Sequence, residues 1–352
     1  VKAANALAEK ASIGQARLPR VGRALRASTA LQADFYSDDS SGADGSAAQA
    51  PRHVVGSAID WLSSRAYVAL APVGDAPSSV LQLALPSLST LAVASPAAQG
   101  MGSISSIALG GHASESVAPA SWLHVLRTGG DGKVAELLVL SLPSMQPMHS
   151  LRFGVPSPVT ASHYDARSAW LYLLCTHPFP KLVRIQMRGG LPAAAPGAGD
   201  TLPLPTWVAA VPILVPFPKA RRLLIFSAPP PMSEAEAAAE AAAANASGSL
   251  WVAPRQRPAL NVCRVRMDSP PPLSDGDGGC TQLRGRHALE EVLSAVADEE
   301  SGVAYAACRS GTALRLRVTP LRVEEQTKPL SSSPLIATAF RPDDGTLWLA
   351  SA

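Results

Sequence analysis

Five segments of this 352-residue chain share one layout, and this layout restricts the possible folds more than any other feature of the sequence. Each segment has an apolar stretch, a short polar turn and a second apolar stretch, which usually carries an aromatic residue. Two short apolar stretches joined by a polar turn are typical of a β-hairpin. The five segments are residues 57–70, 162–175, 210–226, 294–308 and 336–350.

An acidic residue opens the turn in four of the five segments. A carboxylate at this place can accept hydrogen bonds from backbone N–H groups two or three residues later. The stretches after the turns are apolar on both faces, as expected of strands that lie between two neighbouring sheets. We therefore predict Asp-capped hairpins whose second strands are buried on both sides. The four acidic residues are Asp60, Asp165, Asp298 and Asp343.

The spacing of equivalent apolar residues indicates a repeat. A further apolar stretch follows the hairpins, and four strands in roughly 40 to 50 residues is the repeat length of a β-propeller blade. The longer distance from the fourth equivalent residue to the next one, Tyr305, predicts insertions at residues 228–249 and 268–280. The first four equivalent residues, about 50 positions apart, are Tyr67, Leu123, Tyr172 and Leu224.

The sequence thus predicts an all-β fold, a β-propeller of about six or seven four-stranded blades over residues 50–352. The 32 Pro and 26 Gly favour many short strands joined by turns. Residues 1–49, basic and then acidic, are predicted to be a poorly ordered leader. The last hairpin ends at the end of the chain, which predicts an incomplete last blade. We favour a truncated chain, and the alternative is that residues near 31–36 supply the missing strands.

Two other fold classes are alternatives to the propeller. A β-sandwich, or a pair of separate β-domains, would show turns every roughly 8 to 12 residues without a longer period. A parallel α/β fold would need a series of amphipathic crossover helices. Outside an Ala- and Glu-rich stretch at 234–245, the one good helical candidate is residues 287–296.

In this layout the chain resembles β-propeller repeat proteins of the WD40-like kind over residues 50–352. The closest match is the segment 341–351, which looks like the innermost turn and strand of such a blade. No Trp-Asp dipeptide ends a strand at the repeat length, and a Gly-His pair occurs once, at 111–112. The resemblance implies an architecture and identifies no subfamily, and a fold alone does not imply a function.

Patterns typical of enzymes and metal sites are missing from the sequence. There is no Gly-x-Ser-x-Gly nucleophile motif, and the seven His form neither His-x-His nor His-Glu-x-x-His. Cys175 and His177 lack an evident third ligand. The Gly-rich segment 129–133 lacks the full phosphate-loop spacing, and 275–279 lacks the distal Glu of a calcium loop. We predict no catalytic, cofactor-binding or metal-binding residues and no cofactor.

Charge and hydropathy limit the classes of partner that the chain is expected to bind. A formal net charge of +3 and the lack of a basic stripe interleaved with aromatics argue against nucleic acid, and no stretch is long and apolar enough to predict a membrane span. Several basic residues recur on the same strand of three repeats. They lie on the exposed faces of alternating strands. Alternatively, they form a band that binds an acidic protein surface, a phosphopeptide or a polyanion. These residues are Arg184, Arg188, Arg264, Arg266, Arg315, Arg317 and Arg322.

The four Cys show no Cys-x-x-Cys spacing and are too few for a disulfide scaffold. We predict buried thiols and hence a reducing compartment. This favours an intracellular, cytoplasmic location and leaves two alternatives, an organelle signal in the basic leader and secretion with a glycan on Asn245.

The functional hypothesis from the sequence is a non-enzymatic protein-interaction or scaffold module within a larger protein, with a protein partner that the sequence does not identify. One alternative is a propeller hydrolase or lactonase with a metal ion in the central channel. Another is an extracellular or cell-wall structural protein, which the Pro, Ala and Ser content suggests.

Overall fold

The fold is described from a computed structural model of the chain. The residues that it describes are 13–17, 27–28, 54–72, 77–85, 87–95, 102–111, 119–128, 134–154, 159–176, 179–194, 196–205, 208, 213–227, 261–267, 279–283, 290–341 and 345–351. The predicted insertion at 228–249, the turn residue Asp343 and residues 31–36 lie outside this part. The predicted insertion at 268–280 lies mostly outside it, and its last residue begins a strand.

The described residues form six antiparallel sheets, which we number I to VI in chain order. Sheet I contains β3 (Val54–Asp60), β4 (Arg65–Leu70), β5 (Ser79–Ala84) and β6 (Thr90–Ala94). Sheet II contains β7 (Ser103–Gly110), β8 (Trp122–Thr128), β9 (Val134–Ser141) and β10 (Pro147–Gly154). Sheet III contains β11 (Val159–Asp165), β12 (Trp170–Cys175), β13 (Lys181–Arg188), β14 (Leu191–Pro192) and β15 (Thr201–Pro203), with the 3-10 helix η2 (Ala198–Asp200) before β15.

Sheet IV contains β16 (Ile213–Phe217), β17 (Arg222–Ser227), β18 (Asn261–Arg266) and β19 (Cys280–Gln282). Sheet V contains β20 (Val292–Asp298), β21 (Val303–Cys308), β22 (Ala313–Arg317) and β23 (Arg322–Gln326). Sheet VI contains β24 (Leu335–Arg341) and β25 (Thr346–Ser351), together with β1 (Ile13–Arg17) and β2 (Ala27–Ser28).

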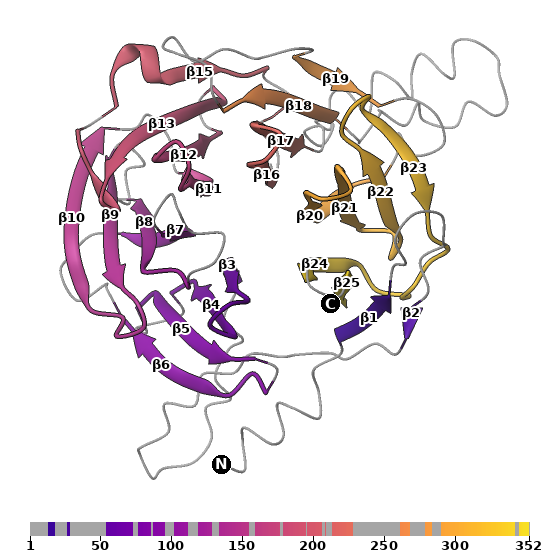
Figure 1. The fold of residues 1–352 in the computed structure, drawn as a ribbon, viewed down its shortest axis with the longest axis horizontal. Coiled ribbons are helices and arrows are strands. Elements are labelled where there is room, and N and C mark those ends of the chain that lie inside the picture. Colours follow the sequence, from indigo (N-terminus) through magenta and orange to yellow (C-terminus); the bar gives the residue numbers. More distant parts are fainter. Residues whose placement is uncertain are drawn as a thin grey trace, which may run out of the picture.

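The sheets stand around a central axis with their first strands innermost, which is the arrangement of a β-propeller (Figure 1). Innermost strands of successive sheets lie side by side from β3 through β7, β11, β16 and β20 to β24. Hydroxyl groups link two of these pairs. Ser106 Oγ lies 2.7 Å from Ser162 Oγ, and Ser294 Oγ lies 2.9 Å from Thr338 Oγ1. The predicted all-β propeller is therefore confirmed.

Sheet VI differs from the sequence prediction. The hairpin β24–β25 was predicted to end an incomplete blade, but β1 from the leader pairs with β25 along Ile13–Arg17 and β2 pairs with β1. Residues 13–17 and 27–28 thus supply the two further strands, and part of the leader belongs to the sheets. The physical reason is that β25 otherwise presents an unpaired edge, which another strand can cover.

The second strands of four hairpins, β4, β12, β17 and β21, are buried on both faces, as predicted from their apolar residues. On β12, Leu171 and Leu173 pack in a cluster with sheet II, whereas Tyr172 and Leu174 pack in a cluster with sheet IV. Similar clusters lie between sheets I and II, IV and V, and V and VI. Each sheet therefore hides apolar surface that it could not hide alone, which is the main stabilising contribution to the ring.

The helical candidate over residues 287–296 is not a helix where the structure describes it. Residues Val292–Asp298 form the strand β20, which pairs with β21 and lies against β24. Helix propensity is a weak local preference, and pairing with β21 inside the ring overrides it.

The predicted Asp caps are confirmed at the three turns that the structure describes. Asp60 Oδ1 accepts hydrogen bonds from the N–H of Leu62 (3.1 Å) and of Ser63 (3.4 Å). Asp165 Oδ2 accepts one from the N–H of Ser168 (3.3 Å), and Asp298 Oδ1 accepts one from the N–H of Ser301 (3.2 Å). These bonds fix the loops that join the first and second strands.

Five turns between first and second strands share a left-handed residue, four positions after the last residue of the first strand. Its φ is +53° at Ser64, +55° at Ala169, +53° at Arg221, +64° at Gly302 and +66° at Gly345. Residues with a Cβ atom are strained in this conformation, and glycine is not. Three of these five turns therefore carry a strained residue.

We expect Ala169→Gly to raise the free energy of unfolding by about 0.5 to 1 kcal/mol, because relief of the left-handed strain exceeds the added entropy of the unfolded chain. Gly302→Ala is the control with the opposite sign, since a Cβ atom there would meet no heavy atom within 4 Å and only the backbone strain counts. Urea unfolding of the two variants measures both changes. A lower stability of Ala169→Gly would contradict the explanation.

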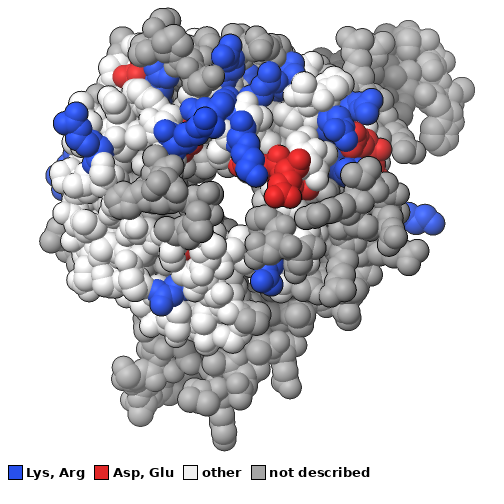
Figure 2. Space-filling view, viewed as in Figure 1, with Lys and Arg blue, Asp and Glu red and all other residues white. Residues whose placement is uncertain are grey.

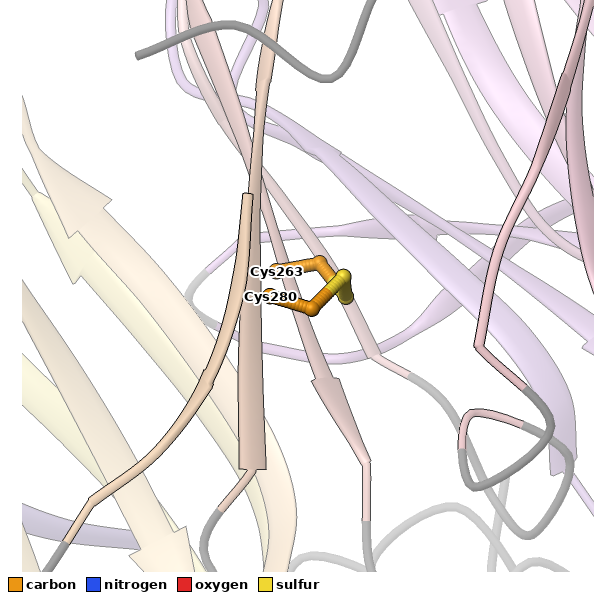
Figure 3. Close-up of a disulfide and its surroundings, with 2 residues drawn as sticks. All are labelled: Cys263 and Cys280. Atoms are coloured by element: carbon orange, nitrogen blue, oxygen red, sulfur yellow. A yellow bond between two sulfur atoms is a disulfide. The ribbon is translucent and has the colours of Figure 1, made fainter. Parts of the chain in front are cut away.

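Two of the four Cys form a disulfide, contrary to the prediction of four buried thiols. Cys263 on β18 lies directly opposite Cys280 on β19, and their sulfur atoms are bonded (Figure 3). Adjacent antiparallel strands bring paired side chains together, although the two Cys are 17 positions apart in the sequence. Cys175 and Cys308 are buried thiols outside the disulfide, as predicted, and burial raises the pKa of Cys308 to about 12. The Cys therefore give no single indication of a compartment.

Candidate interaction face

Alternate turns of an antiparallel sheet lie at the same end. The turns between first and second strands and those between third and fourth strands therefore share one end of the ring, which we call the Asp-turn face because Asp60, Asp165 and Asp298 lie there. Figure 2 looks onto the ring along its axis and shows Lys and Arg gathered over sheets III and IV, next to a smaller acidic patch beside the centre.

Four exposed cations come from the turns of sheets III and IV on this face. Arg167 lies between β11 and β12, Arg188 ends β13, Lys219 lies between β16 and β17, and Arg266 ends β18. We call these four residues the basic arc. Two of them lie in turns and two are the last residues of their strands, which leaves their side chains in solvent while the neighbouring strand residues are buried.

Backbone hydrogen bonds join the turns that carry the arc. The N–H of Met187 donates to the Ala169 carbonyl (2.8 Å), which joins the two turns of sheet III. The N–H of Met267 donates to the Arg221 carbonyl (2.9 Å), which does the same in sheet IV. The Tyr172 hydroxyl donates to the Met267 carbonyl (2.7 Å) and so connects the two sheets. The arc therefore stands on turns that are tied to one another.

An ion pair crosses the same junction. Arg221 Nη1 lies 2.7 Å from Asp165 Oδ2, and the Asp165 side chain is 1% exposed. A buried carboxylate without a partner would be costly, so Arg221 neutralises Asp165 and also brings the turn of Arg167 beside the turn of Lys219. The Arg221 charge is used inside the fold, whereas those of the arc face solvent.

The arc ends at an acidic neighbour in sheet V. The N–H of Lys219 donates to Glu299 Oε2 at 3.4 Å, and the next residue, Glu300, is exposed. Burial raises the pKa of Glu299, which the hydrogen bond from Lys219 partly offsets. Positive and negative side chains therefore meet at the junction of sheets IV and V.

The alternative of a continuous arginine band is not confirmed, because the seven arginines differ in exposure. Arg184 is wrong as a surface residue, because it is 1% exposed, lies 4.4 Å over the Trp170 ring and pairs with Asp200 (Nε to Oδ1, 3.1 Å). The reason is that the segment with η2 and β15 folds back along β13 and covers it.

The other members of the band have different environments. Arg315 and Arg317 both pair with Glu324, and Arg322 joins the same carboxylate at 3.4 Å, so three cations share one negative charge. Arg264 is half-buried, and Arg266 and Arg188 belong to the basic arc. Arg167 and Lys219 were not among the predicted residues, although their place in equivalent turns of neighbouring repeats could have indicated a common face.

Within the described ranges, no group of three or more His, Cys, Asp or Glu side chains could hold a metal ion. In the same part of the chain, no helix is long and apolar enough to cross a membrane.

Comparisons with known proteins give information about the fold only. No protein-family model matches the sequence, and no curated protein is significantly similar to it. A chain in a crystal structure of a mitotic checkpoint complex is similar in structure with a TM-score of 0.49 and 11% sequence identity, over 93% of this chain and 81% of that chain. A similarity of this size carries no argument about function. The sheets themselves show a β-propeller.

Proposed function

We propose that this chain is a non-enzymatic protein-interaction module of a larger scaffold or assembly protein, built as a propeller of six or seven blades, and that its partner docks on the Asp-turn face. The observation that supports this most directly is the basic arc, four exposed cations on one face of turns joined by hydrogen bonds. We place the module inside the cell, in the cytoplasm.

A rigid charged face suits docking for two physical reasons. Turns that are already ordered lose little conformational entropy when a partner binds. Exposed charges of one sign raise the association rate of a partner with the opposite charge, and this effect falls as salt increases. The burial of the Asp165–Arg221 pair helps to keep the arc in one arrangement.

The test is capture of partners from native extract by the full chain and by two charge-reversal variants. The arc variant carries Arg167→Glu, Arg188→Glu and Lys219→Glu. The control variant makes the same change in charge at three other exposed cations, Arg152→Glu, Arg309→Glu and Lys328→Glu, of which the last two lie in connections at the opposite end of the sheets.

We expect mass spectrometry to find proteins that the wild type and the control variant retain and that the arc variant loses. Circular dichroism and thermal unfolding establish that both variants are folded. If the arc variant retains the same proteins as the wild type, partner docking at this face is wrong.

A further inference from the structure

We infer that Cys263 and Cys280 form a reversible thiol–disulfide switch, in which reduction loosens β19 from the edge of sheet IV and oxidation fastens it again. The inference goes beyond the proposed function and does not depend on partner docking. It comes from the position of the disulfide, which joins β18 to the outermost strand of the sheet (Figure 3).

The attachment of β19 relies on few other bonds. This strand has three residues, Cys280–Gln282, and among the strands that the structure describes it pairs with β18 alone. The N–H of Arg264 also donates to the Gly279 carbonyl at 3.1 Å. The outermost strands of sheets I and V have five residues, and that of sheet II has eight. Because a three-residue edge strand has little pairing of its own, we expect the disulfide to supply a large share of its attachment.

The two sulfur atoms differ in their access to solvent. Cys263 is completely buried, whereas Cys280 is half-buried at the start of the outermost strand. Both residues contact the apolar cluster between sheets III and IV. A thiol that approaches from solvent therefore reaches Cys280 Sγ before it reaches Cys263 Sγ, and thiol–disulfide exchange depends on such access.

This difference sets the order of the exchange with a dithiol reductant. One thiolate of the reductant attacks Cys280 Sγ, the bond between the two protein sulfur atoms breaks, and Cys263 leaves as a thiolate that takes up a proton. The second thiolate of the reductant then attacks its own sulfur in the mixed disulfide and releases Cys280, which is protonated in turn. Two electrons pass to the protein, and the reductant becomes a disulfide.

The fold is compatible with both redox states. A free Cys behaves as a small apolar side chain, so reduction leaves no costly polar group in the cluster that surrounds Cys263. The ring already buries two thiols elsewhere, at Cys175 and Cys308. β18 stays paired with β17 along Asn261–Arg266 whatever the state of the sulfur atoms. The structural change is therefore confined to β19.

The test is backbone hydrogen exchange of the native full chain, measured by mass spectrometry with and without an excess of dithiothreitol. Alkylation of free thiols before and after treatment reports how much of the disulfide is reduced. The double variant Cys263→Ala with Cys280→Ala cannot form the bond. Cys308→Ala is the matched control, because it also removes a buried sulfur atom and keeps the bond.

We expect reduction to speed the exchange of the β19 amides at least about tenfold, because the opening of this strand is no longer limited by a covalent bond. Exchange in β6, β10 and β23 should stay unchanged, and oxidised glutathione should restore the slow exchange in β19. Cys308→Ala should respond like the wild type. The double variant should exchange rapidly in β19 with and without reductant, and the wild-type comparison stands without it.

Three results would overturn the inference. A disulfide that an excess of dithiothreitol leaves intact in the folded protein is a permanent bond. Complete reduction with unchanged exchange in β19 would show that pairing and packing hold the strand by themselves. Faster exchange in β6, β10 and β23 as well as in β19 would make the disulfide a fastening of the whole ring and not a local switch.

Discussion

Gly190→Ala is expected to lower the free energy of unfolding by about 3 kcal/mol. Gly190 has a φ of +79°, which a residue with a Cβ atom adopts only under strain of about 1 to 2 kcal/mol. The added Cβ atom would also lie 2.5 Å from Cδ2 of Trp122, whose ring is buried between sheets II and III. Moving a packed ring costs a further roughly 1 to 3 kcal/mol.

The neighbouring residue provides a matched control. Gly189 also has a positive φ, +57°, but a Cβ atom there would meet no heavy atom within 4 Å. Gly189→Ala should therefore lose only about 1 kcal/mol. Urea unfolding of both variants separates backbone strain from the contact with Trp122. Equal losses in the two variants would mean that the Trp122 ring moves aside without cost.

The stability of the protein is expected to decrease by about 3 kcal/mol between pH 7 and pH 4 because of His124 alone. This side chain is completely buried, and burial lowers its pKa from 6.5 to about 4, with the Gly190 carbonyl opposing the shift. One ring nitrogen, Nε2, lies 2.9 Å from that carbonyl, and the ring packs edge-on against Tyr164 at 5.1 Å. The imidazole is therefore neutral in the folded protein.

The sign of the effect follows from this difference in pKa. Below pH 6.5 the unfolded chain binds a proton at His124 that the folded protein does not bind until pH 4. The contribution to stability is complete above pH 6.5, falls as the pH decreases and is lost below pH 4. A difference of this size between folded and unfolded pKa values corresponds to about 3 kcal/mol.

His124→Gln provides the comparison, because its amide can still donate to the Gly190 carbonyl and does not titrate. We expect urea unfolding between pH 8 and pH 4 to show a shallower loss of stability in this variant than in the wild type. Part of the pH dependence should remain, since burial also lowers the pKa of His163 to about 4. Identical pH dependence in wild type and variant would show that His124 is not held neutral by the fold.

The repeat was largely predictable from the sequence because its elements are local. A strand needs apolar residues, and a turn needs a hydrogen-bond acceptor at its start. Both therefore depend on residues that are close together in the sequence. Asp60, Asp165 and Asp298 cap their turns as predicted, and β12 is buried on both faces as its apolar residues indicated. The left-handed residues at Ser64, Ala169 and Arg221 were not predicted, because no glycine marks them.

The candidate site was predictable only in part, because the exposure of its side chains depends on which other segments pack against them. Arg184 and Arg264 occupy equivalent places in their strands, opposite Tyr172 and Leu224, yet the first is buried and the second is half-buried. Alternation shows which residues share a face of one strand and does not show what packs on that face. Cys263 and Cys280 likewise became a disulfide through the pairing of β18 with β19.

The sequence by itself determined the fold class, the hairpins and their buried second strands, because hydrophobic period and turn chemistry act over a few residues. The tertiary structure alone decided which charges face solvent, since that depends on contacts between sheets far apart in the chain. Arg221 is neutralised by Asp165 from the preceding sheet, and the Lys219 turn is placed beside Glu299 of the following one. The basic arc and its acidic neighbour exist because the ring brings these turns to one end.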